Sequence, residues 1–136
     1  MSYTLARIIG ALRRRKNDLI RSALYRPRSG TGATLRNAVL FEAFDGKVVG
    51  DSPLDIFNVL KQSRPDLEFF WTVKKGVVAP AGATALKYGS RAWLNILASA
   101  KYLVNNSAFP WYFKKVEGQV YLQTWHGTPL NRSLRG

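Results

Sequence analysis

The chain has 136 residues, of which 46% are hydrophobic and 12% aromatic, and it carries a formal net charge of +13. This composition is typical of one globular domain and excludes a disordered chain. The absence of cysteine excludes a disulfide framework, and a single histidine excludes the usual zinc sites. No apolar run reaches the roughly 18 residues that a membrane-spanning helix requires. We expect neither a metal nor a cofactor.

Residues 1–28 predict a basic amphipathic helix. The segment holds eight arginines and lysines against one acid, Asp18, and so carries more than half of the net charge. Such a helix favours an anionic membrane surface as its partner, although its apolar stripe could equally pack on the domain or on another part of the protein. Nucleic acid is not expected as a partner, because the segment contains no recognition motif. The stripe recurs at spacings of three and four and consists of Leu5, Ile8, Ile9, Leu12, Leu19, Ile20, Ala23 and Leu24.

Residues 29–36 are rich in Gly, Ser and Thr and predict a linker. From 37 to 136, strand-like and helix-like segments alternate, which predicts an α/β fold with a parallel sheet. The first helix is expected to have Ser52 as its N-cap, Pro53 at its first position and Asp55 in a capping box. The expected strands are 38–44, 67–73, 101–106 and 119–125, and the expected helices are 52–62, 90–100 and one that begins at Pro129.

Three of the expected strand ends carry polar residues that could bind a ligand. In an open parallel sheet, ligands bind outside the carboxyl ends of the strands, so these residues are expected to lie along one edge. They are Gly46, Lys47 and Asp51 after the first strand, Asn105, Asn106 and Ser107 after the third, and His126, Gly127 and Thr128 after the fourth.

His126 is the only histidine, and it lies where a strand is followed by a predicted helix. Thr128 can cap that helix, whose free N–H groups favour an anion, and Gly127 lets a ligand approach the backbone. An imidazole beside an anion site can accept or donate a proton near neutral pH. The simpler interpretation is a hydrogen-bonded loop residue, just as Gly46 and Lys47 can form a plain turn with a solvated lysine.

Three segments of the chain together resemble one enzyme family. "QVYLQTWHGTPL" (119–130) is similar to the signature of the CDP-glycerol glycerophosphotransferases, the teichoic acid primases and polymerases of Gram-positive bacteria. The resemblance extends to "KYLVNNSAFPWYFKK" (101–115) and "LFEAFDGKVVGDSPLDIFNVL" (40–60), in the same order and at matching spacings. It departs from the family pattern at Asn131, where a lysine is usual, and at Ala43 and Ser52, where serine and asparagine are usual.

The resemblance implies a GT-B type transferase with two Rossmann-like domains that face a cleft. Residues 37–136 would be the N-terminal, acceptor-side domain, truncated and without the nucleotide-binding domain, so that the isolated chain would be inactive. His126 inherits the role of the base that deprotonates the acceptor hydroxyl, which then attacks the β-phosphate of CDP-glycerol and releases CMP. Gly46, Lys47 and Asp51 inherit acceptor binding, and the expected substrate-binding set is completed by Asn105, Gly127 and Thr128.

The family also implies the partners and the location of the protein. The expected partners are CDP-glycerol and a lipid-linked acceptor, in the synthesis of teichoic acid or a related cell-wall polymer. The expected location is peripheral, at the cytoplasmic face of the cell membrane, which agrees with the basic helix. The alternative is a non-catalytic basic domain that binds an anionic surface, either membrane or nucleic acid.

Overall fold

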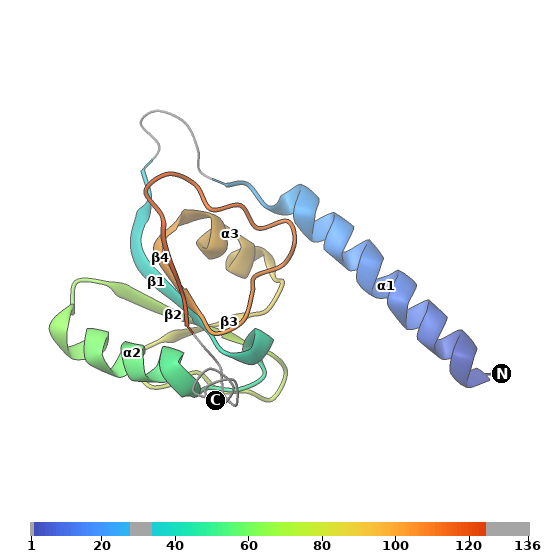
Figure 1. Cartoon of the computed structure of the whole chain (residues 1–136), viewed down its shortest axis with the longest axis horizontal. Coiled ribbons are helices and arrows are strands. Elements are labelled where there is room, and N and C mark those ends of the chain that lie inside the picture. Colours follow the sequence, from blue (N-terminus) through green and yellow to red (C-terminus); the bar gives the residue numbers. More distant parts are fainter. Residues whose placement is uncertain (1, 28–33, 125–136) are drawn as a thin grey trace, which may run out of the picture.

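The computed structural model describes residues 2–27 and 34–124 of the chain. They form a parallel five-stranded sheet with the strand order β3-β2-β1-β4-β5. Helices α2 and α3 lie on opposite sides of this sheet (Figure 1). In chain order the elements are α1 (Ser2–Leu24), β1 (Arg36–Glu42), the short 3-10 helix η1 (Phe44–Gly46), α2 (Asp51–Ser63), β2 (Glu68–Val73), β3 (Thr84–Lys87), α3 (Arg91–Ser99), β4 (Ala100–Asn105) and β5 (Val120–Gln123).

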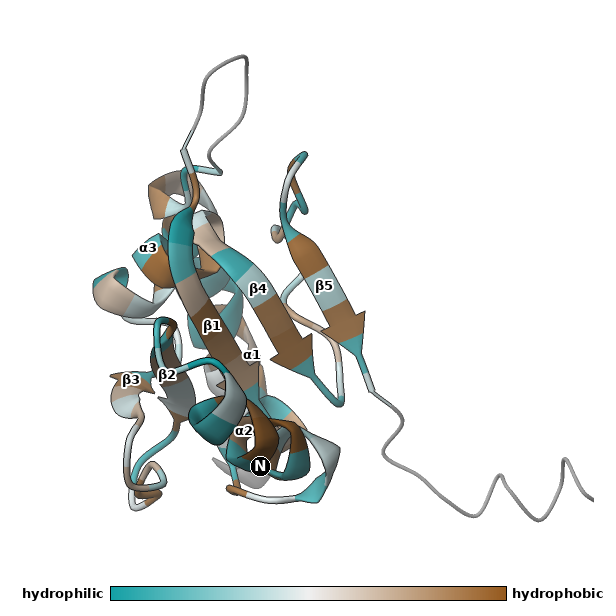
Figure 2. Cartoon of the chain, turned by 90° about the vertical axis from the view of Figure 1, so that its left-hand side faces the viewer, coloured by the Kyte–Doolittle hydropathy of each residue, from teal (hydrophilic) through white to brown (hydrophobic). Residues whose placement is uncertain are grey.

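The central strand β1 is buried on both faces of the sheet. Because side chains alternate along a strand, Leu40 packs with Leu97 of α3 on one face, and Phe41 packs with Phe57 of α2 on the other. Figure 2 shows the hydrophobic run along β1, and its arrowheads for β1, β4 and β5 point in the same direction. A continuous apolar strand covered by helices on both sides is typical of parallel sheets. The predicted class, an α/β fold with a parallel sheet behind a basic amphipathic helix, is confirmed.

Two of the four strand connections contain a helix, β1–α2–β2 and β3–α3–β4, whereas residues 74–83 and 106–119 contain none. Strand β3 is absent from the predicted elements, because four residues in a stretch rich in Gly, Pro and Ala are too short to show periodicity. It pairs with β2, with Thr84 opposite Phe70. At the other edge, β5 pairs with β4 alone among residues 2–27 and 34–124, and its Val120 and Leu122 are exposed.

The start of α2 differs from the expectation. The helix begins at Asp51 with Gly50 as its N-cap, and no side chain caps it, so the predicted cap by Ser52 is wrong. The reason is that the Asp51 carboxylate accepts a hydrogen bond from Asn106 at 2.8 Å, and the chain turns into the helix one residue earlier. At α3, in contrast, Ser90 is a true N-cap, since its hydroxyl accepts a hydrogen bond from the Trp93 N–H at 3.2 Å.

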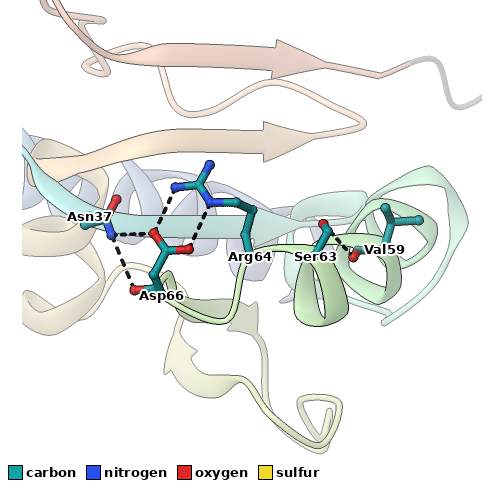
Figure 3. A network of polar contacts seen from close by, with 5 residues as sticks. All are labelled: Asn37, Val59, Ser63, Arg64 and Asp66. Atoms are coloured by element: carbon teal, nitrogen blue, oxygen red, sulfur yellow. Dashed lines mark hydrogen bonds and ion pairs between the residues drawn. The ribbon is translucent and has the colours of Figure 1, made fainter.

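The amino ends of β1 and β2 are joined by polar contacts rather than by apolar packing. The Arg64 guanidinium donates to both oxygens of Asp66 at 2.9 Å, and the Asn37 amide donates to the same carboxylate at 3.2 Å (Figure 3). Arg64 accordingly holds the pKa of Asp66 below its ordinary value. Beside them Arg36 bonds Glu68, so β1 already begins inside the predicted 29–36 linker. These contacts fix the register of β1 against β2 at the end of the sheet opposite the polar loops.

Helix α1 contacts the domain through its C-terminal end. The partly covered residues Asp18, Arg21 and Ser22 precede Tyr25, which is buried in the α3-side cluster. The Tyr25 hydroxyl donates to the Lys114 carbonyl at 3.0 Å and accepts from the Lys114 N–H at 3.1 Å. Figure 1 shows the earlier turns of α1 projecting away from the sheet.

The apolar stripe of α1 does not pack on the domain. Leu5 is 58% exposed and Leu12 63%, and the rest of the stripe that faces the same way is also open to solvent. The alternative in which the stripe packs on this domain is therefore wrong for the part of the chain that the structure describes. Among the same residues, no helix is both long and apolar enough to cross a membrane.

We expect Phe57→Ala to lower the free energy of unfolding by about 3–5 kcal/mol, as large-to-small changes at fully buried aromatic sites do. The Phe57 ring lies edge-on to Phe41 at 5.5 Å and to Trp71 at 5.9 Å between centroids, so alanine would leave a cavity under α2. Val59→Ala, at a 66% exposed position of the same helix, is the matched control and should change stability by less than about 0.5 kcal/mol. Urea unfolding of both variants tests this, and equal effects would contradict the assigned core.

Candidate active site

The carboxyl ends of the parallel strands meet at one edge of the sheet, which is where open parallel sheets bind ligands. The loop that follows β1 contains η1 and leads into α2. Three non-glycine residues in it, Phe44, Asp45 and Asp51, have positive φ angles of 48°, 58° and 60°. Backbone strain of this kind concentrates at functional sites, so this edge is the candidate site.

Asn106 joins the loop after β1 to the start of α2. Its side chain is fully buried, and its Oδ1 accepts a hydrogen bond from the Phe44 N–H at 2.8 Å. Its Nδ2 donates to Oδ2 of Asp51 at 2.8 Å. Because one amide makes both contacts, the segments that follow β1 and β4 are held at a fixed separation. Asp51, a predicted binding residue, keeps its other oxygen for further contacts.

Asn105 connects three strand ends in the same way. Its Nδ2 donates to Oε2 of Glu42 at 3.3 Å, and its Oδ1 accepts from the Ser107 N–H at 2.9 Å. Its backbone carbonyl accepts from the Thr124 N–H at 2.8 Å, directly after β5. Asn105 is fully buried, so it cannot contact a large ligand with its side chain unless a neighbour moves. The structure therefore gives Asn105 a supporting position rather than an exposed binding position.

Glu42 is a residue of this edge that was not predicted from the sequence. It is the last residue of β1 and is fully buried, and its Oε1 has no hydrogen-bond partner among the described residues. Thr72 lies on the neighbouring strand, with its hydroxyl accepting from Trp93 Nε1 at 2.8 Å. The signal that could have identified Glu42 is an acidic residue at the carboxyl end of the otherwise apolar run "AVLFE".

Burial raises the pKa of Glu42 from an ordinary 4.5 to about 7. The nearby charge of Asp45 also raises this pKa, whereas the Thr72 hydroxyl, the Asn105 amide and the Lys74 charge lower it. The edge thus holds a carboxyl group that changes its charge near neutral pH, underneath the loops that carry the predicted binding residues.

Gly46 and Lys47 lie in the turn that closes η1. Gly46 has φ +86°, and a Cβ added there would lie 3.1 Å from Thr72 Cγ2, so the position favours glycine on both grounds. The Gly46 carbonyl accepts from the Lys74 N–H at 2.9 Å, which ties this loop to the end of β2. Lys47 is exposed beside it, where its ammonium group is open to a ligand or to water.

His126, Gly127, Thr128 and the helix expected from Pro129 lie outside the described residues. The last described residue is Thr124, which the Asn105 carbonyl holds at the same edge as Gly46 and Asp51. Within residues 2–27 and 34–124, no three His, Cys, Asp or Glu side chains come together to form a possible metal site.

Comparison with known proteins identifies the family of the chain. Residues 28–133 match the family described as CDP-Glycerol:Poly(glycerophosphate) glycerophosphotransferase. The chain belongs to this family. It is 38% identical over 100 residues to a teichoic acid poly(glycerol phosphate) polymerase of Bacillus subtilis (strain 168), and 34% identical over 132 residues to one of Staphylococcus epidermidis. These alignments cover 71% and 95% of the chain but only 13% and 18% of the two relatives, so the chain spans less than a fifth of their length.

Solved structures agree with this family assignment. The wall teichoic acid polymerase TagF, in a histidine-to-alanine variant, matches with a TM-score of 0.72 at 32% identity, over 93% of this chain and 31% of that chain. A histidine-to-asparagine variant of TagF soaked with CDPG matches with the same TM-score of 0.72 at 31% identity. The predicted family and the Rossmann-like fold of a GT-B type transferase are thereby confirmed.

We expect the pKa of Glu42 to make stability depend on pH. A carboxyl group with a raised pKa stabilises the folded state most fully when both states are protonated, below pH 4.5. That contribution is lost as the pH rises to about 7, because the unfolded chain ionises first. The loss should amount to about 3 kcal/mol.

Glu42→Gln removes the titrating group and should remove this part of the pH profile. The measurement is urea unfolding of both proteins at several pH values between 4 and 8, with the difference between them isolating Glu42. Profiles of the two proteins that run parallel over this range would contradict the raised pKa.

Proposed function

We propose that the chain is the acceptor-side domain of a CDP-glycerol glycerophosphotransferase. The enzyme transfers glycerol phosphate from CDP-glycerol to a lipid-linked acceptor in the synthesis of teichoic acid or a related cell-wall polymer. The family match over residues 28–133 carries this proposal, and the TagF structures soaked with CDPG support the choice of donor. Because the chain spans only a fraction of its relatives, we assign the cytidine nucleotide to a second domain outside this sequence.

The proposed base is His126. It takes the proton of the acceptor hydroxyl while that oxygen forms a bond to the β-phosphorus of CDP-glycerol. The bond from this phosphorus to the bridging oxygen breaks, and CMP leaves with the electron pair. The position of Thr124 supports this role, since the Asn105 carbonyl holds the chain at the candidate edge two residues before the histidine.

The other proposed binding residues surround the same edge. Lys47 is exposed and can pair with a phosphate of the acceptor, while Gly46 keeps the turn close to the sheet. Asp51 can accept a hydrogen bond from an acceptor hydroxyl with the oxygen that Asn106 leaves unoccupied. The remaining members of the proposed set are Asn105, which supports the strand ends, and Gly127 and Thr128, which would receive a phosphate.

In the full-length protein, we expect His126→Ala to lower kcat by about 10²–10⁴-fold, the usual contribution of a general base. His126→Gln should be nearly as damaging, because glutamine keeps hydrogen bonding but cannot take the proton. CMP release with a lipid-linked acceptor measures both variants, and unchanged urea unfolding serves as the control for folding. If the glutamine variant kept most of the activity, the imidazole would not be the base.

We also propose that α1 binds the cytoplasmic face of the cell membrane peripherally. Its exposed apolar stripe can enter the boundary between headgroups and acyl chains, as amphipathic helices do. With 3.6 residues per turn, Arg13 and Arg15 lie on the two borders of this stripe, where they would meet anionic headgroups. Exposed leucines flanked by cations therefore favour an anionic lipid surface over another apolar protein surface.

The double variant Arg13→Glu/Arg15→Glu should lose most binding to vesicles rich in anionic lipid, and salt should release the unchanged protein. Lys101→Glu/Lys115→Glu makes the same change of charge at exposed positions elsewhere and should bind nearly normally. Vesicle co-sedimentation over a series of salt concentrations measures this. Equal losses in both double variants would indicate that only net charge matters and would contradict a site on α1.

A further inference from the structure

A groove of about 540 Å³ lies between α1 and the carboxyl ends of β2 and β3. Its walls come from three segments that are far apart in the sequence: the middle of α1, the residues that follow β2, and the end of β3. Five cations and one carboxylate line it, namely Arg14, Arg21, Lys74, Lys75, Lys87 and Asp18.

The groove is held in shape by contacts of α1 with the loop after β3. Arg21 donates from Nε to the Gly89 carbonyl at 3.2 Å, and its guanidinium carbon lies 5.9 Å from the centre of the Tyr88 ring. The Lys74 ammonium lies 4.7 Å from the centre of the same ring. Tyr88 thus brings one cation from α1 and one from the end of β2 around a single side chain, as cation–π contacts do.

The charge of this groove is not balanced by its own residues. Asp18 is the only carboxylate among the described lining residues, and it already lies 3.6 Å from Arg21. Lys74, Lys75 and Lys87 form no salt bridge with any carboxylate that the structure describes. Burial, together with the nearby Glu42, Asp45 and Asp18, raises the pKa of Tyr88 to about 12, so its phenol adds no negative charge.

The groove opens beside the candidate active site. The Lys74 N–H donates to the Gly46 carbonyl at 2.9 Å, and the Tyr88 N–H donates to the Val73 carbonyl at 2.9 Å. Lys74 and Tyr88 therefore belong both to the groove and to the carboxyl edge that carries the predicted binding residues. A ligand in the groove would therefore lie next to this edge.

The groove faces away from the proposed membrane surface. At 100° per residue, Arg14, Asp18 and Arg21 lie on the side of α1 opposite to Leu5, Leu12 and Leu19. A bilayer that covers the leucines cannot also fill the groove with headgroups. An anion bound in the groove would therefore approach from the side of the helix that faces away from the proposed bilayer.

We propose that this groove binds the phosphodiester groups of the acceptor chain, an inference that rests on the function proposed above. Cations spread over three segments suit a chain with several phosphates better than a single phosphate. Lysine binds phosphate as a point charge, and arginine binds it with two parallel N–H groups. Both residue types line the groove. The groove would hold the part of the acceptor already made, while its terminal hydroxyl reaches the edge near Gly46.

The test uses the full-length protein and a water-soluble, lipid-free oligomer of glycerol phosphate as the probe. Lys75→Glu/Lys87→Glu should weaken binding of this oligomer about ten- to hundred-fold, because each change replaces an exposed attraction for phosphate by a repulsion. Lys75→Gln/Lys87→Gln should give a smaller loss in the same direction. Lys101→Glu/Lys115→Glu is the control of equal charge and should change the Kd by less than about threefold. Calorimetry at constant ionic strength measures all four proteins.

A second arm of the experiment separates the acceptor from lipid headgroups. Binding to anionic vesicles should be nearly unchanged in Lys75→Glu/Lys87→Glu, since these lysines face away from the bilayer. Loss of vesicle binding with normal oligomer binding would assign the groove to lipid and overturn the proposal. It would equally be overturned if the unchanged protein did not bind the oligomer, or if the groove variant bound it normally.

Oligomer binding and catalysis are measured separately, so the two proposals can fail independently. A protein that binds the oligomer through the groove but releases no CMP from CDP-glycerol would disprove the proposed donor and leave the groove site standing. A protein that releases CMP with a lipid-linked acceptor but shows no groove dependence would disprove the groove site alone.

Discussion

Two neighbouring amides, those of Asn105 and Asn106, hold the strand ends of this domain together. Between them the two side chains accept from the backbone N–H groups of Phe44 and Ser107 and donate to the carboxylates of Glu42 and Asp51. The backbone carbonyl of Asn105 also accepts from the Thr124 N–H. Polar groups at a buried edge need such partners, because leaving one unpaired costs about 1–3 kcal/mol. The strained turn around η1 can persist since Asn106 and the end of β2 fix it from two sides.

The charged groups of this edge differ in burial. Glu42 lies inside the sheet with a raised pKa, whereas Lys47, Lys75 and Lys87 lie at the surface. Lys74 stands between the two, since its charge lowers the pKa of Glu42 and its side chain lines the groove. Occupation of the groove by an anion would offset the Lys74 charge and so raise the pKa of Glu42 further.

Elements with a clear hydrophobic periodicity could be predicted from the sequence. The prediction was wrong where contacts between distant residues override the local pattern. The long apolar run of β1 and the 3.6-residue pattern of α3 were recognisable, because burial imposes them directly on the residues. Strand β3 has only four residues and takes its conformation from its pairing with β2. Ser52 does not cap α2, because the residue before it, Asp51, accepts a hydrogen bond from Asn106, which lies 54 positions after Ser52 in the chain.

The candidate site was predictable in its location but only partly in its composition. Strand ends of a parallel sheet converge for geometric reasons, so the loops after β1 and β4 could be placed at one edge in advance. Glu42 ends an apolar run in the sequence, but its raised pKa was not predictable, because it comes from burial by elements elsewhere in the chain. Likewise, the groove needs α1 to dock beside β3, a contact made by Arg21 and Gly89 that no local pattern encodes.

Within the described residues, strand β5 is bonded on one side only, and its two ends are held unequally. At its start, buried Gln119 donates to the carbonyls of Leu97 and Ala100. Its far end is held by less buried contacts, from the Gln123 amide to the Ser107 carbonyl and from the Thr124 N–H to the Asn105 carbonyl. Local opening should therefore begin at the far end, with amide hydrogen exchange fastest there and slowing toward Gln119. A ligand that contacts both β4 and β5 would stabilise the far end of β5. Its binding affinity would then be coupled to the local opening of this strand.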